Sequence, residues 1–351
     1  MRLRICVVSE AIKSPFDEGV KIFVYHFIKE LAKNHDVLGL SRAPNFEGDI
    51  EKYCAKALPK NRLFVSFCLW RKIRAFEPDI ICYIPTAHAT IYSFLRAKVL
   101  KLYYTKSRTV LITLQPRAYS SWSKRVIPLI VADLVFAQST KTKELLERLG
   151  CMVKMIPSGV DLEKFTPASK ELKEKLRNKY AIPINKYIVL HVGHINRNRN
   201  MQFMEDIQSL DGSQAVVVGS TTYPEDLDLI RDIQAKGVIT ITGYIEKIEE
   251  LYQCADCYVF PVFSEGACIE IPLSILEAMA CNLPVVSTRF GGLGNFINEG
   301  NGLFYVNAED EIMAKIQFAK NSDNPRTRNM VEKFAWQNVV QEIVVNSFET
   351  R

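Results

Sequence analysis

The stretch from residue 258 to residue 288 constrains the fold of this chain more than any other. An apolar run at 258–260 predicts a buried strand, and the run that starts at Val285 predicts a second one. The residues between them predict a loop and then a helix that begins at Pro272 and stops before Pro284. A strand, a helix and a strand in close succession form the building unit of a parallel sheet. We therefore expect an α/β fold.

The same alternation runs through the rest of the chain. Near-continuous apolar runs are typical of strands buried on both faces of a parallel sheet. Such runs lie at 3–9, 36–40, 78–84, 108–115, 133–139, 187–193, 214–220 and 238–244. Amphipathic segments such as 20–33 separate them, and only helices are predicted after Ala308. We expect Rossmann-like sheets with helices on both faces.

Length and composition favour two domains in a reducing compartment. A chain of 351 residues is long enough for about two domains. No apolar run reaches the length of a membrane span, and the N-terminal residues MRLRICVVSE predict a strand rather than a cleavable signal. Nine scattered cysteines suit free thiols in the cytoplasm. Cys254 and Cys257 lack a second pair at a suitable distance, so zinc is not expected there.

Charge is distributed unevenly along the chain. The net charge is +6, but residues 1–160 carry 26 Lys and Arg against 13 Asp and Glu, and the remainder carries 19 against 26. The first half is therefore expected to face something anionic, either a membrane surface, an acidic acceptor or nucleic acid. No zinc-finger, helix-turn-helix or aromatic RNA-binding pattern favours nucleic acid. Residues 62–76 and 96–108 mix aromatic and basic side chains, so each is either packed in the core or lies on a membrane.

Two places carry residues suited to an anionic ligand. Glu265 and Glu277 flank the N-terminus of the helix after Pro272, where backbone N–H groups and the helix dipole favour an anion. Gly193 ends a strand and leads into the basic loop 194–200 and a helix expected from about Asn200, which predicts a diphosphate cradle. A capped helix and two solvated loops are the alternative interpretation.

The stretch at 264–288 resembles the donor-binding motif of the retaining glycosyltransferases of family 4, also called group 1. That motif is a Glu-Gly pair followed by PLSxLEAMAxGxPVV, which IPLSILEAMACNLPVV matches nearly letter for letter. The family spaces its two glutamates eight apart, whereas Glu265 and Glu277 are twelve apart. The extra residues 267–270 include another carboxylate, so either Glu265 or Glu270 takes the first role.

Further strings extend the resemblance over essentially the whole chain. CMVKMIPSGVDLEKFTP at 151–167 matches the interdomain signature vIPNGVDxxxFxP, with Ser158 in place of Asn. The segment HVGHINRNRN matches VGRLxxxKN, with His194 at the Arg position and Arg199 at the Lys position. NGLFY at 301–305 is another family signature.

The resemblance implies a role for each matching position. The donor-binding residues would be Gly193, His194, Arg197, Arg199, Asn200, Gly243, Tyr244, Glu265, Gly266, Glu270 and Glu277. Arg197 and Arg199 would hold the diphosphate, where negative charge develops as the glycosyl bond breaks. Glu277 would accept hydrogen bonds from ribose hydroxyls, while Glu265 or Glu270 would orient the sugar. The loop near Gly243 and Tyr244 would border the nucleobase.

Three positions of the first half are also implied. Gln115 stands where the family has a His that meets the donor sugar, and an amide cannot share a proton as imidazole does. Together with Glu265, Glu277 and Arg199 it completes the implied catalytic set. His88 either compensates for the missing imidazole or is structural. Gly19 remains from a Gly-rich loop that lies against acceptor and donor sugar in the family, with a simple turn as the alternative.

By this resemblance the chain has the GT-B fold, in which two Rossmann-like domains with parallel sheets face each other across a cleft. Residues 1–158 would bind the acceptor and 169–333 the nucleotide sugar, with a linker at 159–168 and a C-terminal helix at 334–351 that returns to the first domain. The chain would be a hexosyltransferase-type enzyme that moves a sugar from a nucleoside-diphosphate sugar to a glycan or lipid-linked acceptor with retention of configuration. No metal and no cofactor would be needed. We expect a cytoplasmic protein, either free or peripheral at the cytoplasmic face of the membrane.

Two other interpretations stay open. Because Gln115 and His194 replace family residues, a catalytically weak or inactive protein that binds a sugar nucleotide or a membrane partner is the alternative. A sugar-nucleotide epimerase shares the architecture, but the LEAMA and GVD strings are typical of the transferases.

Overall fold

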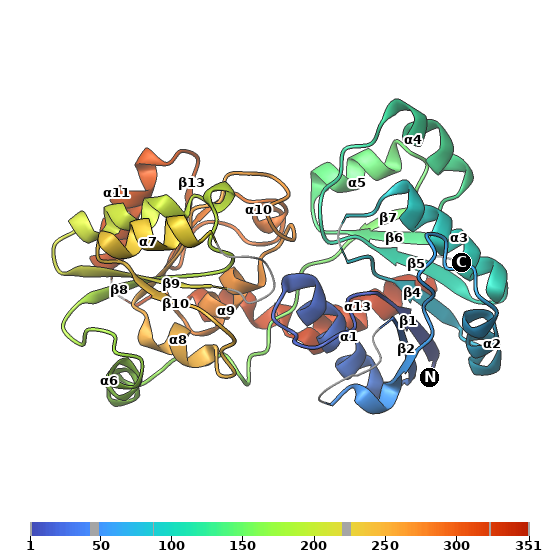
Figure 1. Ribbon diagram of the computed structural model, residues 1–351, viewed down its shortest axis with the longest axis horizontal. Coiled ribbons are helices and arrows are strands. Elements are labelled where there is room, and N and C mark those ends of the chain that lie inside the picture. The colour runs from blue at the N-terminus through green and yellow to red at the C-terminus, as the bar shows by residue number, and fades with distance from the viewer. Residues whose placement is uncertain (1, 43–48, 87, 220–225, 323, 350–351) are drawn as a thin grey trace. The chain divides into compact units, whose positions relative to one another are not determined.

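The computed structural model of this chain consists of two compact units, each built on its own sheet (Figure 1). It describes residues 2–42, 49–86, 88–219, 226–322 and 324–349. The first unit comprises residues 1–158, 268–271 and 336–351, and the second comprises 159–267 and 272–335. The predicted α/β class with two Rossmann-like halves is confirmed.

Seven strands in the described part of the first unit form one sheet with parallel pairings throughout. They are β1 (Arg4–Val8), β2 (Asp36–Ser41), β3 (Cys54–Lys56), β4 (Ile80–Tyr83), β5 (Arg108–Ile112), β6 (Leu134–Ala137) and β7 (Val153–Met155). The order is β3-β2-β1-β4-β5-β6-β7, so the direction of winding reverses between β1 and β4. The carboxyl ends of strands at such a reversal form the usual ligand crevice of an α/β sheet.

Helices flank this sheet, and the last helix of the chain packs on the first. The helices are α1 (Gly19–Asn34), η1 (Glu51–Tyr53), α2 (Phe67–Phe76), α3 (Ile91–Tyr103), α4 (Ser121–Val126), η2 (Ile127–Leu129), α5 (Thr140–Glu147) and α13 (Trp336–Glu349). Figure 1 shows α13 in red alongside α1 in blue. The Trp336 ring meets Phe23 edge-on at 5.4 Å and stacks on His26 at 5.0 Å, which anchors α13 to the first unit.

Six strands in the described part of the second unit form a parallel sheet with the order β10-β9-β8-β11-β12-β13. They are β8 (Tyr187–Val192), β9 (Ser213–Val218), β10 (Ile239–Ile241), β11 (Cys257–Phe260), β12 (Val285–Thr288) and β13 (Leu303–Val306). Here the winding reverses between β8 and β11, so the loops after these two strands meet at the switch point.

Helices cover both faces of the second sheet. They are α6 (Lys170–Lys179), η3 (Arg197–Arg199), η4 (Met201–Ser209), α7 (Leu227–Ala235), α8 (Glu249–Cys254), α9 (Leu273–Ala280), α10 (Leu293–Phe296), α11 (Asp310–Lys320), α12 (Thr327–Val331) and η5 (Glu332–Phe334). In Figure 1, α7 and α11 lie on one side of the sheet, and α6 and α8 lie on the other. Ile233 of α7 and Ile316 of α11 bury their side chains in one cluster with Val259 of β11.

The predicted domain boundaries differ from the two units in two places. Residues 334 and 335 group with the second unit, and residues 268–271 group with the first unit instead of the second. The N–H of Glu270 donates to Leu114 O at 2.8 Å, and the Ile271 N–H lies 3.4 Å from the Gln138 side-chain oxygen. Backbone hydrogen bonding thus holds the inserted residues beside the carboxyl ends of β5 and β6.

The helix predicted from about Asn200 is present as the 3-10 helix η4, which begins at Met201. A short 3-10 helix, η3, precedes it. Asn200, which separates them, adopts the left-handed conformation with φ 58° and ψ 37°. A left-handed residue interrupts a right-handed helix, so no continuous α-helix starts in the cradle.

The segment 62–76 is half buried rather than enclosed. Within it α2 starts at Phe67, and its Leu69 and Ile73 pack into the core. Phe67 is 72% exposed, and Trp70 stacks on it with ring centroids 5.2 Å apart. Arg74 in turn lies over the Trp70 ring at 5.3 Å. The outer face of α2 is therefore aromatic and basic.

Candidate functional site

Arg199 lies across the switch point of the second sheet. Although it belongs to the loop after β8, it is only 7% exposed. Its Nη2 donates to Ala267 O, in the loop after β11, at 2.9 Å. A Cβ on Gly193 would lie 2.4 Å from Arg199 Nη1, so glycine is the residue that leaves room for the guanidinium. Arg199 thus links the two loops that form the crevice.

Two hydrogen-bond donors are buried at this point without an acceptor. Arg199 Nε and Asn200 Nδ2 have no hydrogen-bond partner among the described residues. Buried donors without partners are costly, and a phosphate group offers acceptor oxygens that match a guanidinium. The donor set is therefore compatible with a phosphate group.

The neighbouring Arg197 is placed differently. Its side chain is 60% exposed and lies 3.5 Å from Asp232 and 4.0 Å from Asp226. His194, at the family's Arg position, is partly buried. The structure therefore brings Arg199 into the cradle and holds Arg197 against carboxylates on its rim.

Glu277 lies on α9, which follows the loop after β11. Its Oε2 accepts a hydrogen bond from the Tyr252 hydroxyl at 2.7 Å. Burial raises the pKa of the Glu277 carboxyl to about 6, although the Tyr252 hydrogen bond acts in the opposite direction. A carboxyl with this pKa is mostly ionised at neutral pH and can accept hydrogen bonds from ligand hydroxyls.

The two candidates for the first glutamate lie in different units. Glu265 is exposed on the loop after β11, followed by Gly266 in the left-handed region with φ 83°. Glu270 is 2% exposed in the first unit, where its Oε1 accepts from the hydroxyls of Ser139 at 2.5 Å and Thr142 at 2.7 Å. Because Glu270 is engaged in packing the inserted segment, the geometry favours Glu265 for the sugar-binding role.

Gly243 and Tyr244 follow β10, the edge strand on the β8 side of the second sheet. Gly243 has φ 97°, and a Cβ added to it would meet no described atom within 4 Å. Tyr244 is 62% exposed, so its ring is free to stack on a planar group.

In the first unit the structure brings His88 and Gln115 together. Burial and the nearby Arg117 lower the pKa of the His88 imidazole, and the Gln115 side chain beside it raises that pKa to a smaller extent. His88 thus supplies, from an adjacent loop, an imidazole beside Gln115. Gly19 starts α1, and its close neighbour is Ile269, at 3.0 Å from a Cβ built there.

Sequence reasoning missed His191. This residue of β8 is fully buried, its ring hydrogen-bonds with Val259 O at 2.9 Å, and it faces the space above Gly193. A signal was available, because a histidine two residues before the cradle glycine interrupts an otherwise apolar strand. Tyr252, the partner of Glu277, had no comparable signal because it lies on another helix.

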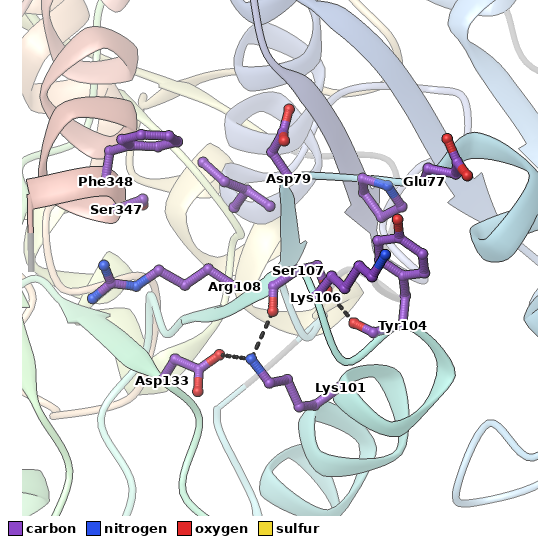
Figure 2. Close-up of a pocket in the computed structure, with 12 residues that line it drawn as sticks. Glu77, Asp79, Lys101, Tyr104, Lys106, Ser107, Arg108, Asp133, Ser347 and Phe348 are labelled. Atoms are coloured by element: carbon purple, nitrogen blue, oxygen red, sulfur yellow. Dashed lines mark hydrogen bonds and ion pairs between the residues drawn. The ribbon is translucent and has the colours of Figure 1, made fainter. Parts of the chain in front are cut away.

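Outside this crevice, the described part of the chain has fewer features of a ligand site. Among the described residues, no three His, Cys, Asp or Glu side chains gather as a metal ion would require. No helix in the part described is long and apolar enough to cross a membrane. A cavity of about 520 Å³ lies at the amino ends of β4 and β5, and Figure 2 shows the side chains that line it. There Lys101 donates hydrogen bonds to Asp133 at 2.8 Å and to Ser107 O at 2.6 Å. Acidic and basic side chains both line it, so it suits an anion less well than the cradle.

Two protein-family models match this chain. Residues 18–164 match the model described as Glycosyltransferase Family 4, and residues 186–319 match the model described as Glycosyl transferases group 1. A sulfoquinovosyl transferase of Arabidopsis thaliana is 26% identical over 78% of this chain and 57% of its own length. An Escherichia coli UDP-Gal:alpha-D-GlcNAc-diphosphoundecaprenol alpha-1,3-galactosyltransferase is 28% identical over 45% of this chain and 42% of its own length. The chain spans about half the length of the curated relatives it matches.

Among solved structures, Anabaena HepE in complex with UDP-glucose superimposes with a TM-score of 0.74 at 16% identity, covering 98% of this chain and 99% of the other. A glycosyltransferase from Rickettsia africae superimposes with a TM-score of 0.80 at 19% identity, covering 99% of both chains. These likenesses extend over both units and agree with the predicted fold.

Proposed function

The chain belongs to the group 1 glycosyltransferases of family 4, and on this premise we propose that it transfers the sugar of a nucleoside-diphosphate sugar to a glycan or lipid-linked acceptor. The observation that carries the proposal is the pair of buried donors on Arg199 and Asn200, at the switch point of the second sheet, that have no partner in the described part of the chain. That the structural relative HepE was solved with UDP-glucose supports a donor of this kind.

The donor would lie along the loops after β8 and β11. Arg199 holds the diphosphate and stabilises the charge that develops on it as the glycosyl bond breaks. Glu277 accepts hydrogen bonds from the ribose hydroxyls, and Glu265 orients the sugar. Tyr244 borders the base. These roles come from the resemblance to the family motif, and the burial of Arg199 beside Gly193 supports the first of them.

We further propose a reaction with retention of configuration and without a metal ion. In this proposal the acceptor hydroxyl attacks from the face that the diphosphate leaves, and the leaving phosphate oxygen takes the acceptor's proton. The fixed charge of Arg199 supplies the stabilisation that a divalent cation provides elsewhere.

A nucleotide screen tests the donor site. A ligand that binds only the folded state at a hundred times its Kd stabilises it by about 2.7 kcal/mol, which is several degrees in melting temperature. We expect one of UDP, GDP, ADP or TDP to raise the melting temperature and EDTA to leave the shift unchanged. No shift with any nucleotide would overturn the proposal and favour a partner protein without a donor site. Slow donor hydrolysis without acceptor would separate an enzyme from a pure binder.

The first unit has a surface suited to anionic lipid. The outer face of α2 carries Phe67 and Trp70 beside Arg71 and Arg74, and the neighbouring α3 exposes Leu102. Aromatic rings at the level of the headgroups and basic side chains among them are the usual means of peripheral membrane binding. We propose that this face binds the membrane that would carry a lipid-linked acceptor.

Vesicle binding tests this surface. The protein is expected to cosediment with phosphatidylglycerol-containing vesicles at low salt, with each basic residue near the surface contributing about 1 kcal/mol. Phe67→Glu should reduce binding at least about tenfold, because it places a carboxylate among anionic headgroups. Leu227→Glu, at a residue of the second unit that is 59% exposed, is the matched control and should bind as the unchanged protein does. Equal binding by both variants would exclude the α2 face.

A further inference from the structure

His191 occupies the point where β8 and β11 separate. The two strands pair at Val189 with Cys257 and at Leu190 with Tyr258, and the pairing stops there. The next residue of β8 is His191, whose Nδ1 lies 2.9 Å from Val259 O. The imidazole therefore takes the place of the next backbone hydrogen bond between the two strands, at the base of the crevice.

This contact determines which ring nitrogen carries the proton. A backbone carbonyl can only accept, so Nδ1 must be the protonated nitrogen and must donate to Val259. Burial, which outweighs the effect of the Val259 hydrogen bond, lowers the pKa of His191 to about 3, so the ring is neutral at physiological pH. Its Nε2 is then a bare acceptor, and it has no hydrogen-bond partner among the described residues.

Nε2 and the Arg199 guanidinium approach the same space. A Cβ built on Gly193 would lie 3.1 Å from His191 Nε2 and 2.4 Å from Arg199 Nη1. His191 is fully buried, so a ligand in the crevice would meet the guanidinium before the imidazole. Tyr258 and Phe260 flank the ring with centroid distances of 6.1 Å and 6.0 Å, which holds its plane.

A count of hydrogen bonds explains why an acceptor is useful there. A guanidinium has five N–H groups. One of those on Arg199 donates to Ala267 O, and a phosphate bound in two-point fashion would take two more. The groups on the side of Gly193 need an acceptor that does not cancel the positive charge. A neutral imidazole nitrogen meets this need, whereas a carboxylate would neutralise the cation that the phosphate requires.

We propose that His191 is a positioning residue for donor binding: when the diphosphate binds, Arg199 donates a hydrogen bond to His191 Nε2, which has no partner among the described residues before the ligand arrives, and this contact orients the guanidinium toward the diphosphate. The inference rests on the proposed nucleoside-diphosphate site. It assigns to β8 a buried residue that acts on the ligand solely through Arg199.

Two substitutions separate the two ring nitrogens. His191→Asn retains an N–H near the Nδ1 position and removes the Nε2 acceptor, whereas His191→Gln extends an oxygen toward the Nε2 position. Calorimetry would compare the nucleoside diphosphate that stabilises the unchanged protein with the corresponding nucleoside, which lacks phosphate. His191→Asn should weaken diphosphate binding roughly tenfold, the value of one hydrogen bond to a charged group, and should leave nucleoside binding unchanged. His191→Gln should recover most of the loss.

A double-mutant cycle and a spectrum of the unchanged protein complete the test. In an Arg199→Ala background, His191→Asn should cause no further loss of diphosphate affinity. In ¹⁵N spectra of the unchanged protein, the His191 Nε2 signal should move on addition of the diphosphate and stay in place on addition of the nucleoside. This measurement does not depend on the folding of any variant.

An equal loss of nucleoside and diphosphate affinity, a full loss in the Arg199→Ala background, or a stationary Nε2 signal would overturn the inference. Failure of the unchanged protein to bind any nucleotide would instead overturn the proposed function.

Discussion

An Arg199→Ala variant is expected to transfer sugar about 100- to 1000-fold more slowly than the unchanged protein. Removal of one preorganised donor to a developing oxyanion commonly costs this much in kcat. Arg199 is buried, is anchored to Ala267 O and presents Nε without a described partner, so its orientation is fixed before the donor arrives. The loss should appear mainly in kcat, because charge on the leaving phosphate is greatest in the transition state.

Arg197→Ala is the matched control for this prediction. Arg197 carries the same charge two residues earlier but is exposed and lies against Asp226 and Asp232. Its removal should lower kcat/KM by no more than about threefold, since exposed ion pairs contribute little. If the two variants lost activity equally, the loop would act through its overall charge and the special position of Arg199 would be refuted. Initial rates measured with saturating acceptor distinguish these outcomes.

Hydrophobic periodicity predicts the strands that position this site because they are buried on both faces. The runs at 187–193 and 258–260 lie where β8 and β11 form, and Gly193 marks the end of the first. β3 was not predicted because it is not buried on both faces. It has three residues, Cys54–Lys56, and each retains some exposure, so its sequence carries no apolar run.

Contacts between distant segments could not be predicted. The insertion at 267–270 contains one more carboxylate than the family motif, and composition alone leaves Glu265 and Glu270 equivalent. The structure distinguishes them because hydroxyls of Ser139 and Thr142, more than 120 residues earlier in the chain, bind Glu270. The same holds for Arg199, whose burial depends on Ala267 and Gly193 together. Sequence motifs therefore identify the loops, and packing decides which side chain of a loop faces the ligand.

Replacing Glu277 with Gln is expected to weaken nucleoside-diphosphate binding by about 10- to 100-fold at pH 8. Hydrogen bonds to a charged acceptor contribute about 1.5 to 3 kcal/mol, and an amide oxygen accepts less strongly than a carboxylate. The Tyr252 hydroxyl can still donate to the Gln oxygen, so the local packing is preserved. Titration calorimetry with the diphosphate that stabilises the protein measures the change. Glu265→Gln is the control, because an exposed glutamate assigned to the sugar should not alter the affinity for a ligand without sugar.

The same substitution should change how binding and stability depend on pH. Because the folded pKa of Glu277 is raised to about 6, its carboxylate is protonated below that pH, and nucleotide affinity in the unchanged protein should fall as the pH drops through 6.

A raised folded pKa also means that this group favours folding below about pH 4.5, and that this contribution disappears as the pH rises through about 6. Glu277→Gln should therefore lose the pH dependence of affinity and be more stable than the unchanged protein by about 2 kcal/mol at pH 8, with no gain at pH 4. Urea unfolding at the two pH values provides the comparison. A variant that binds nucleotide weakly and is also less stable at pH 8 would show that Glu277 serves the packing of α9 and not the ribose.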